Sequence, residues 1–315
     1  MATDLMIGII KAEMAATGDA VASIGSLKSG SLTLKPQYKE HKSGFPQITD
    51  IKVPEIITGS FKFDCEEIGL IKTHASLGVA ALAAGVPYNV DVKCQAPTAQ
   101  GGAFQMEGSG YIKGISGQVN ANDFGAMTVE VDCVPMGTGG TELIKFTNIA
   151  GTGTNTIAAP SYTHQALTSD SNNLSFGTPT VAKGAGAASN CRSFNFNATG
   201  NFKYHTSGFP PVIDLAIMES NEFTLSAEFE DPAAVLLTDA LAALTPGNQP
   251  VTNVTVNATY QIIGGTDVVV SLKHAMVEPD LSFNPGNDWN GVTVKCTALL
   301  PVGSLPTSGW AMTIV

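Results

Sequence analysis

Residues 41–46 read HKSGFP, and residues 205–210 read HTSGFP, 164 positions further along the chain. After each SGFP the chain continues with apolar and acidic residues at matching positions, QITDI and then PVIDL. Glycine permits a tight turn and proline fixes its own φ angle, so each segment predicts the turn between two strands. The recurrence indicates that the chain contains two copies of one unit.

Further blocks recur in the same order along the chain. SLTL at 31–34 is matched by SFNF at 193–196, and NVDV at 89–92 by NVTV at 253–256. FGAMTVEV at 124–131 resembles WNGVTVKC at 289–296. The alternation of apolar and polar residues in these blocks is typical of half-buried strands.

The length of 315 residues agrees with two domains. We expect a mainly β protein of two tandem β-sandwich or barrel-like domains, each with one flanking α-helix. The first domain is predicted over residues 1–150, with an N-terminal arm at 1–30, and the second over 187–315. Residues 151–186 are rich in Gly, Thr and Ser and are predicted to be a linker.

The helix of the second copy is predicted from its boundary signals. Asp231 is a natural N-cap, Pro232 suits the first helical position, residues 233–244 are rich in Ala and Leu, and Pro246 precedes a glycine. The equivalent helix of the first copy is predicted at about 67–84, although two glycines interrupt it. The predicted strands cover 88–94, 110–115, 128–134, 253–263, 267–273 and 292–300.

The charge of the chain argues against a tight grip on nucleic acid. The net charge is −11, and Arg192 is the single arginine, so the forked donors that hold phosphates and guanine edges are missing. An acidic surface past which nucleic acid moves without sticking agrees with this composition.

The remaining composition gives no sign of a membrane span or a metal site. The five cysteines lack CxxC spacing, and we expect buried free thiols without zinc or disulfides. No apolar run approaches the roughly 20 residues of a membrane helix. The N-terminus lacks the features of a signal peptide, so we expect synthesis and folding in the cytoplasm.

Candidate catalytic residues have simpler structural interpretations. His41 and His205 are repeated because the unit is repeated, and Asp50 and Asp214 would each supply half of a carboxylate pair from a different domain. A Ser161, His164 and Asp170 trio lies in the low-complexity segment without a GxSxG motif. We therefore expect no enzyme activity, cofactor or metal.

The order of elements and the two SGFP-plus-strand blocks resemble the bacteriophage major tail tube family. The resemblance implies a non-enzymatic virion protein, which assembles in the host cytoplasm into stacked rings of a hollow tail tube for DNA ejection. Rings of six single domains would become rings of three two-domain chains, a homotrimer with pseudo-sixfold symmetry. The implied partners are copies of the chain, other tail proteins (tape measure, terminator, distal tail or baseplate, sheath) and DNA as passing cargo, without a membrane. The candidate assembly and fold residues are Gly44, Phe45, Pro46, Asp50, Gly208, Phe209, Pro210 and Asp214.

Other functions remain open at this point. A terminator or secretion-tube component would form one ring instead of a long polymer. A two-domain surface adhesin or carbohydrate-binding module would also be β-rich and acidic, but it should carry a secretion signal and exposed aromatic platforms. An enzyme is the third alternative and would need a pocket with perturbed titratable groups.

Overall fold

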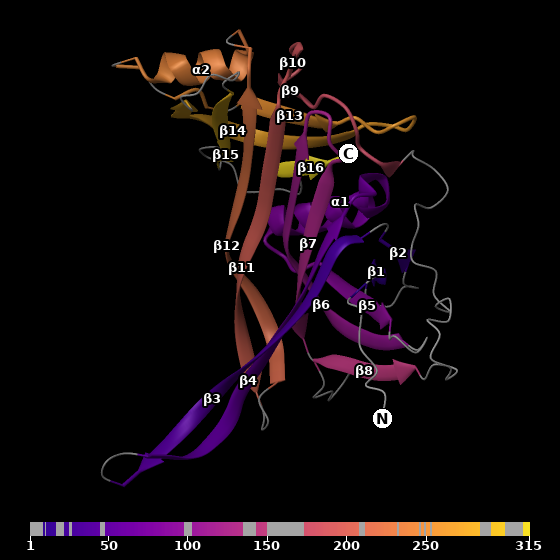
Figure 1. Cartoon of the computed structure of the whole chain (residues 1–315). Coiled ribbons are helices and arrows are strands. Elements are labelled where there is room, and N and C mark those ends of the chain that lie inside the picture. The colour runs from indigo at the N-terminus through magenta and orange to yellow at the C-terminus, as the bar shows by residue number, and fades with distance from the viewer. Residues whose placement is uncertain are drawn as a thin grey trace.

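The computed structural model shows a mainly β chain with antiparallel strands and, within the described residues, two helices (Figure 1). The described residues are 9, 11–16, 22–24, 27–44, 48–97, 103–134, 143–149, 173–207, 212–231, 233–245, 247–248, 250–252, 254–283, 291–299 and 311–315. The predicted β class is therefore confirmed.

The described strands of the first half, up to residue 149, are β1 Lys11–Ala16, β2 Ala22–Ser23, β3 Leu27–Ser43, β4 Ile48–Cys65, β5 Asn89–Pro97, β6 Ala103–Asn120, β7 Ala126–Val134 and β8 Ile144–Ile149. Those of the second half are β9 Thr180–Lys183, β10 Ala188–Asn190, β11 Ser193–Ser207, β12 Val212–Phe229, β13 Val254–Tyr260, β14 Val268–Phe283, β15 Val292–Ala298 and β16 Met312–Ile314. All six strands predicted from the sequence overlap one of these. The range predicted as a linker contains β9, which pairs with β13.

The order of strand pairing is the same in the two halves. In the first half it runs β2-β1-β5-β6-β7-β4-β3, with β8 on the other edge of β6. In the second half it runs β10-β9-β13-β14-β15-β12-β11, with β16 on the other edge of β14. One further ladder, between β11 and β6, joins the halves into one sheet.

Two long hairpins, β3–β4 and β11–β12, run away from the helices (Figure 1). Their registers end with Ser43 opposite Ile48 and Ser207 opposite Val212, so the two predicted strand pairs are confirmed, and part of each SGFP segment lies outside the described residues. Gly44 has φ of 80°, which glycine tolerates because it has no Cβ.

The hairpin registers correct one match made from the sequence. Ser193 lies opposite Glu228, and Ser29 lies opposite Asp64, so the position equivalent to Ser193 is Ser29. The match of SLTL with SFNF was therefore displaced by two residues. It still placed the apolar residues on the correct face, because the side chains of a strand alternate with a period of two.

Helix α1, Ile68–Ala84, agrees with its prediction, and it ends at Gly85 in the left-handed conformation. Gly78, which the sequence suggested as a weak point, lets the helix approach the sheet, because a Cβ there would lie 2.7 Å from Ile115 Cδ1. Helix α2, Val235–Ala243, is shorter than predicted. Asp231 accepts a hydrogen bond from the Ala233 amide at 2.8 Å, but it caps a turn before the helix, whose N-cap is Ala234.

One connected hydrophobic core extends through both halves. It contains all five cysteines as free thiols, and their predicted burial is confirmed. Burial raises the pKa of the Cys65, Cys133, Cys191 and Cys296 thiols to about 12. Neither helix in the described part of the chain is long and apolar enough to cross a bilayer.

Candidate self-association site

The ladder between β11 and β6 joins the two halves of the chain by strand pairing. It is antiparallel and runs from Ser193 opposite Asn120 to Thr199 opposite Gly114. Along β11 the side chains of Phe194, Phe196 and Ala198 alternate into the core and are almost fully buried. This ladder, with the side chains that flank it, is called the seam below.

An aromatic and acidic cluster lies where β11 leaves β6. The ring of Tyr111 lies 4.9 Å from that of Phe202 and 5.9 Å from that of Tyr204. The Tyr204 hydroxyl donates to Asp132 Oδ2 at 2.6 Å, and Lys113 Nζ lies 3.7 Å from the same oxygen. Burial raises the pKa of the Asp132 carboxyl, although the hydrogen bond from Tyr204 and the charge of Lys113 oppose the shift.

Helix α1 covers the other side of the seam. It lies against β11 and against β16 of the second half. Asn221 Nδ2 donates to the Leu82 carbonyl oxygen at 2.8 Å, and a Cβ at Gly200 would lie 2.8 Å from Leu82 Cδ2. The first half thus contributes β6 and α1 to the seam, whereas the second half contributes β11, β12 and β16.

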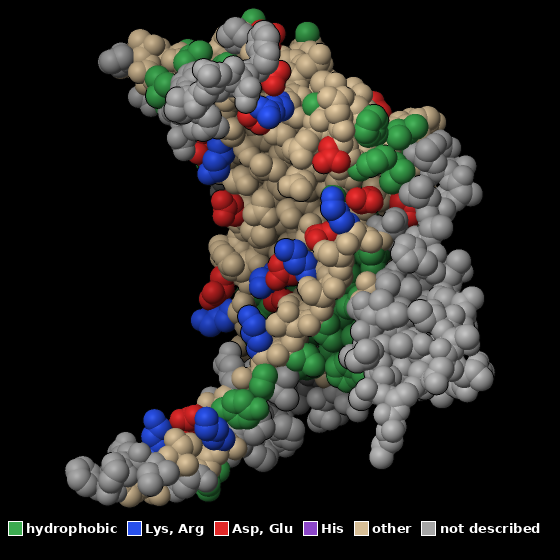
Figure 2. Space-filling model, viewed as in Figure 1, with side chains coloured by type: hydrophobic (Ala, Val, Ile, Leu, Met, Phe, Trp, Pro, Cys, Tyr) green, Lys and Arg blue, Asp and Glu red, His purple; other side chains and the backbone are tan. Residues whose placement is uncertain are grey.

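Each strand of the seam has an equivalent in the other half of the chain: β3 is equivalent to β11, and β14 is equivalent to β6. In the described chain β3 and β14 do not pair with each other. Among the described strands β3, the equivalent of β11, pairs with β4 alone. Ser282 and Phe283 at the end of β14, the equivalent of the distal part of β6, pair only with β15 in the described chain. Apolar side chains are exposed on β3, on β8 and at the end of α2, namely Leu34 40%, Tyr38 54%, Phe146 47%, Leu241 43% and Leu244 53%. Figure 2 shows hydrophobic side chains gathered on the projecting β3–β4 hairpin, beside lysines and acidic residues.

Of the predicted assembly residues, the structure describes three, and these lie toward the ends of the two long hairpins. Gly44 occupies the β3–β4 turn, and Asp50 and Asp214 lie in β4 and β12, near the ends closest to the turns. The remaining predicted residues lie outside the described residues, namely Phe45, Pro46, Gly208, Phe209 and Pro210.

The candidate catalytic residues are not brought together in the described structure. His41 lies opposite Ile51 in one hairpin, and His205 lies opposite Leu215 in the other. Ser161, His164 and Asp170 lie outside the described residues. Among the described residues, no three His, Cys, Asp or Glu side chains form a group that could hold a metal ion.

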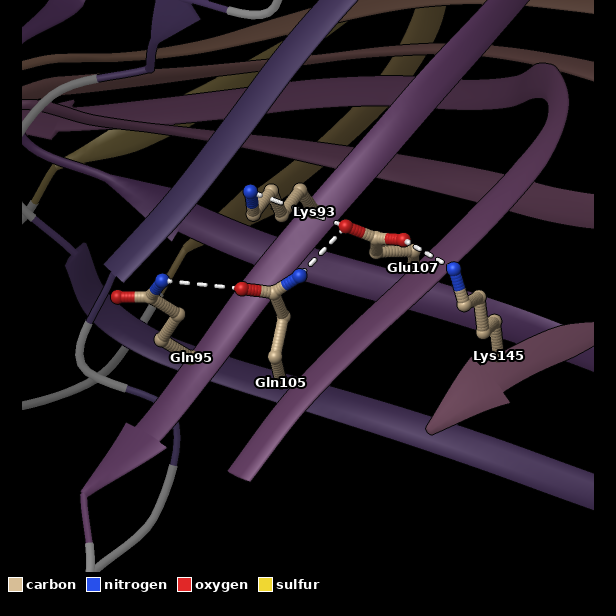
Figure 3. A network of polar contacts seen from close by, with 5 residues as sticks. All are labelled: Lys93, Gln95, Gln105, Glu107 and Lys145. Carbon is tan, nitrogen blue, oxygen red and sulfur yellow. Dashed lines mark hydrogen bonds and ion pairs between the residues drawn. The ribbon is translucent and has the colours of Figure 1, made fainter. Parts of the chain in front are cut away.

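A polar network on β5, β6 and β8 fixes the face of the first-half sheet that points away from the core (Figure 3). Gln95 Nε2 donates to Gln105 Oε1 at 3.3 Å, and Gln105 Nε2 donates to Glu107 Oε1 at 2.5 Å. Lys93 and Lys145 lie 3.7 and 3.8 Å from the Glu107 oxygens. The two lysines and the amide thus compensate the carboxylate of Glu107, and the network holds three strands in register.

Sequence reasoning missed the seam residues, although one signal pointed to them. Leu34 and Tyr38 are apolar residues of the strand before the first SGFP, and their repeat positions, 164 residues later, are Ala198 and Phe202.

No protein-family model matches the chain. No curated protein is similar to it at a significant level.

Proposed function

We propose that this chain is a structural subunit that polymerises with copies of itself, as the major tail tube subunit of a bacteriophage. In this proposal its two halves are tandem β-sandwich domains, and three chains form a pseudo-sixfold ring. Rings stack into a hollow tube through which DNA passes during ejection. The observation that carries the proposal is that two halves with one order of strand pairing meet through different strands, β11 and β6.

A contact between different strands of equivalent units can be repeated indefinitely. Such heterologous contacts generate a closed ring when the rotation closes, and an open filament when it does not. In the described chain the unit uses this contact once, and equivalent edges remain at β3 and β14. Exposed edges are a hazard for aggregation, so natural proteins cover them, and self-assembly covers them here.

The electrostatics support passage of DNA without binding. The net charge is −11, and the single arginine, Arg192, has its guanidinium 3.8 Å from a Glu228 carboxylate oxygen. A surface of this kind repels phosphates and offers them no bidentate partner. The further partners, tape measure, terminator, baseplate and sheath proteins, and the location in the virion tail follow from the same proposal.

The test is electron microscopy of the purified chain at high concentration, together with its mass in solution from light scattering. Hollow tubes, or rings of three chains with sixfold lobes, are the expected result. Isolated rings that never stack would instead identify a terminator-like ring component. A compact monomer at every concentration would contradict the proposal and favour the binding-module alternative.

A further inference from the structure

We propose that β3 of one chain pairs with the end of β14 of a second copy, in the register that β11 and β6 adopt within the chain. This intermolecular seam also brings β8 of the first chain onto α2 of the second. The inference deepens the proposed function and rests on it in one respect, that the chain associates with copies of itself. It specifies which surfaces meet and which residues face each other.

The register follows from two equivalences in the strand pairings. The hairpin registers match at 164 positions, so Thr33 takes the place of Asn197. Ser116 lies opposite Thr128 of β7, and Ser282 lies opposite Thr293 of β15, so Ser282 takes the place of Ser116.

Within the chain, Asn197 lies opposite Ser116. In the intermolecular seam, Thr33 of one chain therefore lies opposite Ser282 of the next. The strands run antiparallel, as β11 and β6 do.

The exposed apolar residues of β3 are those that such a contact would cover. Leu34 takes the place of Ala198, which is fully buried in the internal seam, yet Leu34 is 40% exposed. Tyr38 takes the place of Phe202, whose ring packs on Tyr111, yet Tyr38 is 54% exposed. Large apolar side chains at positions that are covered in the equivalent contact indicate that another surface covers them.

The two helices also differ in the burial of an apolar side chain near the C-terminal end. Leu82 stands three residues before the C-cap of α1 and is 1% exposed, whereas Leu241 stands three residues before the C-cap of α2 and is 43% exposed. Beside α1 lies β16, whose Ile314 is 2% exposed.

The β8 residue equivalent to Ile314 is Phe146, because Ile314 lies opposite Val270 in β14 and Phe146 lies opposite Met106 at the same position of β6. Phe146 is 47% exposed and stacks on Phe104. Leu241 of α2 and Phe146 of β8 are thus exposed, whereas Leu82 and Ile314 are buried. Both exposed side chains are apolar, so contact between them would remove both from water.

The occupant is a second copy because the two unpaired sides belong to opposite ends of one chain. The β3–β4 hairpin projects at one end of the molecule, and α2 with β14 lies at the other (Figure 1). One chain cannot join its own two sides, whereas a head-to-tail neighbour supplies each missing side. Since each chain offers one of each, the association continues until a ring closes.

The first experiment is a disulfide cross-link in the proposed register. The variant Thr33→Cys/Ser282→Cys is oxidised mildly and analysed by non-reducing electrophoresis. Directly opposite residues of an antiparallel pair have the Cα separation of about 4.5 to 5.5 Å that a disulfide accepts. We expect covalent dimers and trimers linked through the two introduced cysteines. The five native thiols should not contribute, because they are buried.

Two matched controls calibrate the cross-link. Asn197→Cys/Ser116→Cys should form the equivalent bond within one chain, with no increase in mass. The single variant Thr33→Cys should give no series of covalent multimers on the gel. Absence of covalent multimers, when the internal control oxidises and the unmodified chain forms rings or tubes, would overturn the seam but leave the proposed function standing.

A second variant tests the apolar contact without cysteine chemistry. Leu34→Glu should leave the monomer folded because the side chain is exposed, and it should weaken association at least about tenfold by placing a charge in a buried contact. Leu77→Glu is the matched control, because Leu77 is 47% exposed and lies on α1, which takes no part in the proposed contact between chains. Both variants are measured by sedimentation and microscopy.

These measurements separate the two proposals. Equal association of the two variants would overturn the seam. Cross-linked trimers that never stack into tubes would support the pairing of β3 with β14 between chains and contradict the proposed tail-tube function. A chain that is monomeric at every concentration and yields no cross-link would overturn both.

Discussion

The internal seam and the free β3 edge occupy equivalent positions in the two halves, but their apolar side chains differ in burial. The internal seam has Phe194, Phe196 and Ala198 buried, and the Asp132 carboxyl beside it is held by Tyr204. The β3 edge has Leu34 and Tyr38 exposed. In the proposed assembly the difference has a reason: the internal contact forms together with the fold, whereas the contact at β3 must leave a monomer that is stable without it.

The largest expected difference between the two regions concerns aromatic side chains. Phe196→Ala should lower the free energy of unfolding by about 3–5 kcal/mol, because it leaves a cavity in the core at the internal seam. Tyr38→Ala should leave the unfolding of the monomer almost unchanged and weaken self-association. Denaturant unfolding below the concentration of assembly measures both. Equal effects on unfolding would break the comparison.

A smaller difference concerns the hydroxyl of Tyr204. Tyr204→Phe should cost about 1–3 kcal/mol of unfolding free energy, because it removes the 2.6 Å hydrogen bond and leaves the partly buried Asp132 carboxylate without that donor. The equivalent position in β3 is Glu40, an exposed residue with Lys52 Nζ at 2.6 Å. Glu40→Gln should change monomer stability little, because surface ion pairs contribute little. Thermal unfolding of both variants compares the two positions.

The smallest expected effect is a pH dependence of opposite sign at these two carboxyls. Burial raises the pKa of Asp132, so the folded state binds the proton more tightly than the unfolded state does. The contribution of Asp132 to stability is therefore fully present below the ordinary aspartate pKa and is lost as pH rises through the raised value. Lys52 lowers the pKa of Glu40, so the contribution of Glu40 is lost as pH falls.

The check is unfolding at several acidic pH values for the natural chain, Asp132→Asn and Glu40→Gln. Relative to Asp132→Asn, the natural chain should gain stability as the pH falls through the window. Relative to Glu40→Gln, it should lose stability. The same sign for both residues would contradict the assignment of burial as the cause at Asp132.

The local elements were readable from the sequence because their signals are local. The strand pairs expected around each SGFP, and the strands expected from the valine and threonine stretches, are confirmed by the structure. The start of α2 was wrong, since Asp231 caps a turn before the helix. The glycines of α1 were interpreted as weak points because the sequence does not show that a sheet lies against Gly78.

The sequence by itself determined the β class, the repeated unit, the places of the two helices and the burial of the thiols. These follow from periodicity, turn chemistry and composition, which act over a few residues. Only the tertiary structure decided that β11 of one half joins β6 of the other. That pairing is the reason why the exposed Leu34, Tyr38 and Phe146 are proposed to contact a second copy. The choice of a strand's neighbour depends on edges brought together from distant parts of the chain, and no local pattern records it.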